Sequence, residues 1–454
     1  MAKHGGVFMT NVDGYTASNT VPSENIGGLL FDIGRRENPF SGYSVAQAKL
    51  GNRQVVEINS LEDAVQLGIE ENGLLGGVAY YHIEKFFALA GSGQRLFIMF
   101  ADCTSNFNAI EDMQTAAKGL CFHIGLWTEQ ELFTKVNDDY RLNSWVADVE
   151  TVCEKLGGRI KKQGENYVNY DGNAQVVVVI NANPGHITNG QTAITEIDLT
   201  KLPNAISNCP YVAISLGQES SDDVHAMQLK NHNQCPVGNI GMALGVLAVA
   251  PVQHSIGYVN NYNLFAACQS AELGFGNLAI TSEGANIAWA ATASFTHIDT
   301  LTYTKRNTQI VQKGYIMLTN YDGYENGIYF SGDTTLSDGD FRTIARCRTM
   351  AKARRLVRMA LLPYVNAPVQ VNASTGLLSA SQITTFKNLI TSALDTGMVN
   401  PGSSVSQISG RTVTIDANQN ILKNDELIID FGIVPVGTTT IINVTEHFAT
   451  STSA

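Results

Sequence analysis

The chain has 454 residues and a formal net charge of −12, with 29 Lys and Arg against 41 Asp and Glu. This length allows two or three domains with a sizeable buried core. The acidic balance argues against direct nucleic-acid binding, because such a face needs clustered excess cations. Charged residues make up only 15% of the chain, a share typical of a protein whose surface is covered by neighbours in an assembly.

The charge is distributed unevenly. Residues 1–300 hold 16 Lys and Arg against 30 Asp and Glu, a net charge of −14, whereas residues 301–454 hold 13 against 11, a net charge of +2. The seven cysteines are scattered and form no CxxC pair, which favours reduced thiols in a cytoplasmic compartment. We find no signal peptide, and no apolar run reaches the roughly 18 residues of a membrane span.

Residues 1–25 alternate small, apolar and polar types without a helical period. This pattern predicts an extended N-terminal arm, for which 22 residues would reach up to roughly 70 Å. A frayed terminus is the alternative interpretation.

Strands and helices alternate over residues 26–300, which predicts an α/β region with mostly parallel strand pairing. Ser60 and Asp63 give an N-cap signal for the first helix, and Gly91 and Gly93 end the second. The predicted strands are 26–33, 95–101, 122–127, 175–181 and 211–216. One predicted helix begins at residue 60, and four more cover residues 78–90, 108–119, 144–156 and 238–249.

The remaining chain predicts a C-terminal α+β domain over 301–437 and a C-terminal arm over 438–454. Two strands, 314–318 and 327–330, are followed by two helices. The helices cover 340–362 and 379–396, and Gly397 stands in the C-cap position of the second. Three alternating runs, 412–415, 426–434 and 439–447, predict a terminal β unit.

Motifs for chemistry are weak. The glycine-rich Gly91–Gly93 follows a helix and precedes a strand, the reverse of the order in a dinucleotide site. His225, His232 and Cys235 offer three potential metal ligands in eleven residues, but structural zinc usually takes four. We therefore expect no cofactor, no metal and no catalytic residue.

One helix carries a strong charge pattern, with seven basic residues and no acid between positions 342 and 358. At about 100° per residue, its apolar side chains fall on one arc and Lys352, Arg354, Arg355 and Arg358 on the opposite arc. Two interpretations remain open. The basic arc is either solvated and paired with local acids such as Asp333, or it docks on an acidic partner surface. The apolar arc contains Met350, Ala353, Leu356, Val357, Ala360 and Leu361.

The order of these elements resembles the contractile tail sheath proteins of phages and R-type bacteriocins, most clearly over residues 305–448. The matching segments are Lys313–Leu318, Gly332–Leu336, Arg342–Arg358, Phe386–Gly397, Leu427–Val436 and Ile441–Val444. The family often has tryptophan just before its G-x-x-T-L segment, where this chain has Tyr329. Looser matches lie at Ile26–Ile33, Asn59–Asp63 and Phe86–Gly93.

The resemblance implies a structural subunit of a virion tail sheath, assembled in the bacterial host cytoplasm. Such subunits form six-fold helical cylinders around an inner tail tube and meet baseplate and tail terminator proteins. Their N- and C-terminal arms complete a small sheet in neighbouring copies. The implied arm residues are Val7, Phe8, Val12, Tyr15, Ile441, Ile442, Val444 and Phe448. The implied tube-binding residues are Arg348, Lys352, Arg354, Arg355 and Arg358.

Two other classes remain as alternatives. The first is another phage structural protein, such as a capsid or baseplate subunit. The second is a nucleotide- or metal-dependent α/β enzyme.

Overall fold

The computed structural model describes most of the chain outside its ends and several connections. The described residues are 24–33, 50–71, 74–128, 130–136, 139–157, 174–181, 202–216, 238–264, 310–319, 321, 328–401 and 405–444, together with six short strands between residues 161 and 297.

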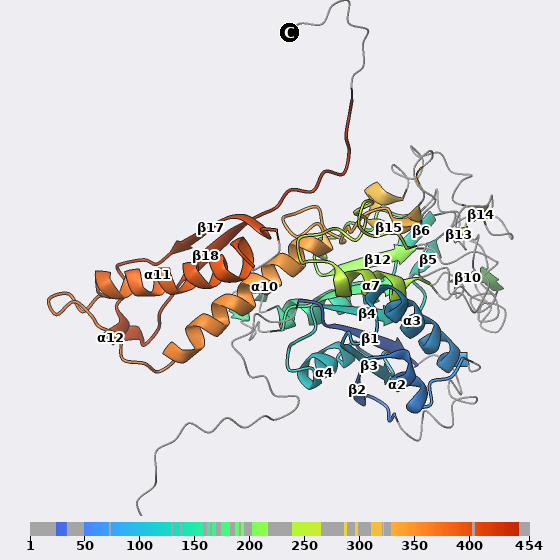
Figure 1. Cartoon of the computed structure of the whole chain (residues 1–454), viewed down its shortest axis with the longest axis horizontal. Helices are drawn as coiled ribbons and strands as arrows, with labels where there is room; N and C mark the ends of the chain where they lie inside the picture. The colour runs from blue at the N-terminus through green and yellow to red at the C-terminus, as the bar shows by residue number, and fades with distance from the viewer. Residues whose placement is uncertain are drawn as a thin grey trace, which may run out of the picture.

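A large eight-stranded sheet forms the centre of the molecule (Figure 1), in the order β16-β15-β12-β9-β4-β1-β3-β2. Its six inner strands run parallel, and β2 and β16 join the two edges antiparallel. The strands are β1 Gly27–Asp32, β2 Val55–Ile58, β3 Leu96–Ala101, β4 His123–Trp127, β9 Val177–Asn181, β12 Val212–Leu216, β15 Tyr315–Thr319 and β16 Tyr329–Phe330.

Helices cover both faces of this sheet, which explains why the inner strands are continuous buried runs. A Cβ added at Gly28 would meet Met113 of α4, and one added at Gly125 would meet Leu244 of α7. Since Gly125 pairs with Leu29, the residue after Gly28, α4 and α7 lie on opposite faces. The helices are α2 Leu61–Gln66, α3 Leu74–Ala90, α4 Ala109–Ala116, α5 Trp145–Leu156 and α7 Ile240–Val249.

Helices α3 and α7 approach each other closely because α7 has glycine at two contact positions. A Cβ at Gly241 would lie 2.3 Å from the carbonyl oxygen of His82, and one at Gly245 would lie 2.9 Å from that of Phe86. The uniformly buried α7 is thus held between α3 and the sheet.

A second unit follows the sheet and has its own core (Figure 1). Helices α10 and α11 form a hairpin that packs on the two-stranded β17–β18 ribbon. The core joins Ala353, Leu356 and Val357 of α10 to Ile390 and Leu394 of α11. The elements of this C-terminal unit are α10 Ile344–Leu361, η4 Leu362–Tyr364, α11 Ala380–Leu394, η5 Asp395–Val399, β17 Ile408–Thr414, α12 Ile421–Asn424 and β18 Asp430–Pro435.

Short elements complete the described chain. One 3₁₀ turn, η3 Val311–Lys313, precedes β15. The antiparallel hairpins are β5 Phe133–Val136 with β6 Asp139–Leu142, β7 Lys161–Gln163 with β8 Asn166–Val168, β10 Ile187–Asn189 with β11 Thr192–Ile194, and β13 Asn286–Ile287 with β14 Thr296–His297.

The structure confirms the mixed α/β class and its mostly parallel sheet but corrects the predicted boundary at residue 300. Strand β15 pairs with β12, so the large sheet continues to Phe330. The buried run Tyr315–Thr319 is stabilised by pairing inside this sheet rather than in a separate C-terminal domain.

The expected cap at Gly397 also needs correction, because the chain continues through it as a π-helical turn to Val399. Gly397 is buried, and a Cβ there would lie 2.4 Å from Leu356 Cδ1. The position therefore favours glycine because α10 and this turn come so close. Of the predicted terminal runs, 412–415 and 426–434 correspond to β17 and β18, whereas residues 439–444 form no described strand and 445–447 lie outside the described chain.

Candidate functional site, a charged joint and two exposed surfaces

Helix α10 begins at a capped and buried N-terminus. The Thr343 hydroxyl accepts the backbone N–H of Arg346, and the Asp333 carboxylate accepts that of Ala345 at 3.0 Å. Burial raises the pKa of Asp333, while the bond from Ala345 acts in the opposite direction. Besides this bond from Ala345 to Asp333, the first turn contacts a local acid through its backbone, where Arg346 donates to the carbonyl oxygen of Asp340 at 3.3 Å.

Arg348 lies fully buried one turn further along α10. Its Nη2 donates to three backbone carbonyl oxygens, those of Glu24 at 3.0 Å, Leu247 at 2.9 Å and Ala250 at 3.0 Å. Burial lowers the pKa of Arg348 to about 10, so the side chain remains charged at neutral pH. One guanidinium therefore joins α10, the end of α7 and the segment before β1.

Lys352 forms the next contact, and it is also buried. Its Nζ donates to the Glu24 carboxylate and, at 2.7 Å, to Oε1 of Gln407. Gln407 Nε2 in turn donates to Glu24 Oε1 at 3.0 Å. The exposed fractions of the Lys352 and Glu24 side chains are only 3% and 15%, so water screens this ion pair poorly.

Arg354 and Arg355 bind the amino ends of β4 and β9. Arg355 Nη2 donates to the carbonyl oxygens of Cys121 at 2.8 Å and Gln175 at 3.1 Å, and its guanidinium lies 3.7 Å from the centre of the Phe122 ring. Burial lowers the pKa of Arg355 to about 10. Arg354 donates to the carbonyl oxygen of Gly157 and, at 2.8 Å, to Oε1 of Gln175.

The basic arc of α10 is therefore the joint between the C-terminal unit and the large sheet. Of the residues that the resemblance assigns to tube binding, Arg348, Lys352 and Arg355 are buried against their own chain. The apolar arc is packed as predicted, and its partners are α11 and the ribbon. The most remote contact, Glu24, is 328 residues from Lys352, so local sequence carried no signal for it.

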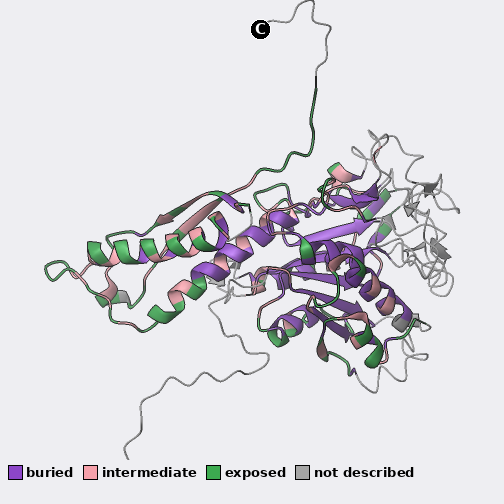
Figure 2. Ribbon diagram, in the orientation of Figure 1, coloured by how far each residue is buried: buried purple, intermediate pink, exposed green. Residues whose placement is uncertain are grey.

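Arg358 and several apolar residues that follow it are exposed at the end of α10, and Figure 2 shows exposed residues along this end of the helix. The exposed fractions are 53% for Met359, 40% for Leu362 and 65% for Val365. No acidic residue occurs in the sequence between Asp340 and Asp395. We call Arg358, Met359, Leu362, Tyr364 and Val365 the hairpin tip.

The β17–β18 ribbon and the segment after it form the second exposed surface. Among the described strands, β17 and β18 pair only with each other. The chain then leaves the body of the molecule (Figure 1), and the exposed fractions of Ile441, Ile442 and Val444 are 57%, 78% and 82%. The other predicted arm residues, Val7, Phe8, Val12, Tyr15 and Phe448, lie outside the described residues, as do His225, His232 and Cys235.

Comparison with known proteins connects this architecture to one class of assembly. A family described as DUF2586, C-terminal domain, matches residues 340–453. The helical sheath of the anti-feeding prophage (AFP) in its contracted state is similar over 99% of this chain and 100% of its own, at 12% identity and a TM-score of 0.52. The contracted sheath complex of PVC, an extracellular contractile injection system, is similar over 99% and 98%, also at 12% identity and a TM-score of 0.52. No curated protein matches the sequence.

The chain has the fold of a contractile sheath protein. The predicted resemblance to sheath proteins is confirmed at this level. The DUF2586 match begins just before α10 and covers the C-terminal unit.

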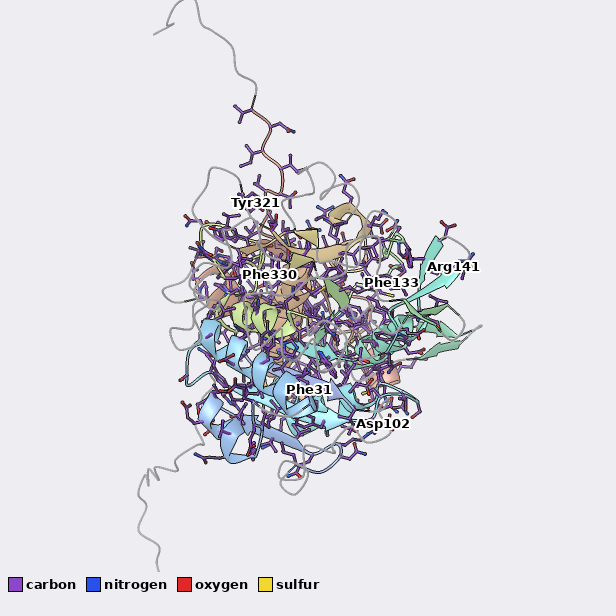
Figure 3. All side chains as sticks on the ribbon, turned by 90° about the vertical axis from the view of Figure 1, so that its right-hand side faces the viewer. Phe31, Asp102, Phe133, Arg141, Tyr321 and Phe330 are labelled. Carbon is purple, nitrogen blue, oxygen red and sulfur yellow. The ribbon has the colours of Figure 1, made fainter. Side chains whose placement is uncertain are left out.

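The carboxyl ends of the parallel strands, where α/β sheets bind ligands, carry a buried polar network in this sheath fold. Asp32, which is 4% exposed, accepts bonds from the Cys103 N–H at 3.0 Å, the Thr128 hydroxyl at 2.7 Å and Gln130 Nε2 at 3.0 Å. Figure 3 looks onto this end of the sheet, where Phe31 and Asp102 mark β1 and β3. The Asp32 carboxylate thus links the loops that follow β1, β3 and β4.

The described residues contain neither a candidate metal site nor a candidate membrane span. No group of three or more His, Cys, Asp or Glu side chains there is arranged to hold a metal ion. None of the described helices combines the length and the apolar character needed to cross a bilayer.

Proposed function

We propose that the chain is a structural subunit of a contractile sheath, not an enzyme. Copies would polymerise as a helical cylinder of stacked six-membered rings around an inner tube, and contraction would drive the tube through a target cell envelope. The observation that carries the proposal is the fold shared with two sheath proteins over nearly the full length of each chain. Baseplate and tail terminator proteins would meet the ends of the cylinder, and assembly would take place in the bacterial host cytoplasm.

The β17–β18 ribbon supports this proposal through its edges. A two-stranded sheet is marginal alone, and its unpaired edge groups bind added strands. We propose that neighbouring copies supply those strands from residues 1–25 and 438–454. The side chains that would enter the ribbons of neighbours are Val7, Phe8, Val12, Tyr15, Ile441, Ile442, Val444 and Phe448.

The hairpin tip supports a narrower assignment of the tube-facing surface. Of the five basic residues first assigned to tube binding, only Arg358 is exposed, and Arg354 is half-buried. Exposed apolar side chains beside a cation fit an apolar partner surface that carries carboxylates. We propose that this partner is the inner tube.

Polymer formation tests the proposal directly. The full chain expressed alone should form helical cylinders or stacked rings in negative-stain micrographs. A variant that lacks residues 1–20 should stay folded, as measured by circular dichroism, but remain a soluble monomer, because it has no N-terminal strand to donate.

Other outcomes would contradict the proposal. If the truncated chain still formed cylinders, the N-terminal arm would not be required for polymerisation. Closed shells, or small rings without filaments, would indicate a capsid or baseplate subunit, and a cofactor that copurifies with the chain would indicate an enzyme.

A further inference from the structure

Glu24 is held by three buried partners that belong to the other end of the sequence. Its carboxylate accepts Lys352 Nζ and Gln407 Nε2, and its carbonyl oxygen accepts Arg348 Nη2 at 3.0 Å. Lys352 and Gln407 also bond to each other at 2.7 Å, so the three side chains close a triangle. We call the Glu24–Lys352–Gln407 triangle the arm anchor.

The arm anchor stands at a mechanically sensitive position. Glu24 is three residues before β1, which begins at Gly27 and pairs with both β3 and β4 in the interior of the large sheet. If the contacts of Glu24 did not hold, tension applied to residues 1–23 would act directly on β1. Loss of β1 would break both of its ladders and open the sheet between β3 and β4.

The side-chain partners of Glu24 connect to the β17–β18 ribbon, from which the C-terminal extension leaves the molecule. Gln407 directly precedes β17, the strand that pairs with β18, and the C-terminal extension follows β18. Lys352 lies on α10, whose core is shared with both β strands. The path from the N-terminal segment to the ribbon therefore crosses a few buried polar bonds and bypasses the large sheet.

We propose that the arm anchor transmits tension between the N-terminal segment and the β17–β18 ribbon, and so protects β1 from being pulled out of the sheet. The proposal rests on the proposed function in one respect, namely that a neighbouring copy holds residues 1–23. A second copy of this chain would then load Glu24 whenever subunits separate or rotate during contraction.

Force spectroscopy on single molecules tests the anchor without any polymer. The full chain is tethered by tags at its two ends and held at constant force in optical tweezers. The variants Glu24→Gln and Lys352→Gln should shorten the lifetime of the folded chain by roughly tenfold or more, because each leaves a buried partner unpaired. The double variant Glu24→Lys with Lys352→Glu should recover much of the lifetime, since the Gln407 amide can both donate and accept.

The matched control is Arg53→Gln, which breaks the exposed 3.1 Å pair with Asp112 and should leave the lifetime unchanged. Wild-type lifetimes in both Gln variants would overturn the proposal. If either variant fails to fold without force, the charge-exchanged double variant decides: a lifetime no longer than that of the other Gln variant counts against the anchor.

Polymers give a separate answer. Cylinders of Glu24→Gln subunits should assemble but fragment more than wild-type cylinders on contraction or shear. If the wild-type chain formed no polymer at all, the proposed function would fail, while the single-molecule lifetimes would still decide the anchor.

Discussion

At the scale of residues, the buried cations of α10 are paired mainly with backbone. Arg348 and Arg355 donate to five carbonyl oxygens, and Lys352 has the buried carboxylate partner Glu24. Sequence identified these side chains as unusual because so many bases occur without acids. It could not identify their partners, since carbonyl oxygens occur at every residue and carry no sequence signal.

His123 is a residue that burial keeps neutral, and the nearby cations of α10 act in the same direction. The side chain is fully buried, and burial, reinforced by Arg348 and Arg355, lowers the pKa of His123 well below its usual value. Below about pH 6.5 the unfolded chain binds a proton at His123 that the folded chain does not bind. As the pH decreases below this value, His123 should therefore lower the free energy of unfolding by up to about 1.4 kcal/mol per pH unit.

The variant His123→Phe isolates this effect. The difference in the free energy of unfolding between variant and wild type, from urea titrations, should be constant between pH 7 and 8 and shift in favour of the variant from pH 6.5 to 5. A difference independent of pH over the whole range would show that folded His123 takes up its proton normally.

At the scale of elements, helix boundaries were predictable and their surroundings were not. The Ser60 cap and the extent of α5 follow from capping residues and an apolar period. A continuous apolar run predicted α7, and α3 begins four residues before its predicted start. For α10 the period correctly gave the apolar arc, but it cannot say what covers the opposite side. Arginine and lysine normally indicate solvent, so the covering of the basic arc by the large sheet was missed.

Arg355 tests whether this basic arc is a structural joint. Arg355→Lys should destabilise the chain by about 2–4 kcal/mol, because an ammonium cannot stack flat on Phe122 and also reach two carbonyl oxygens. Arg355→Met should cost less, since no charge is left buried. The exposed Arg358→Met on the same helix should change stability by less than about 0.5 kcal/mol. Urea unfolding measures all three, and equal losses at positions 355 and 358 would contradict the assignment.

At the scale of the whole molecule, charge is separated between the large sheet region and the hairpin tip. The first 300 residues have a net charge of −14, residues 301–454 have a net charge of +2, and the hairpin tip carries Arg358. Sequence predicted this separation and the order of elements. It misplaced the boundary at residue 300, because β15 and β16 are distant in sequence from the sheet that they complete.

The proposed orientation, with the hairpin tip toward an acidic tube, predicts a position-dependent effect of charge reversal. Arg358→Glu should weaken cosedimentation of the sheath subunit with purified inner tube by roughly two- to fivefold at low salt, and leave assembly of sheath polymers intact. The difference should shrink at high salt, because exposed charges are screened. Arg354 is unsuitable for this test, since it bonds to Gly157 and Gln175 in the joint.

The matched control is Arg53→Glu, an equal charge reversal at an exposed position of the large sheet region, which should leave tube binding unchanged. Equal weakening by both reversals would indicate a general effect of net charge and would remove the hairpin tip as the tube-facing surface.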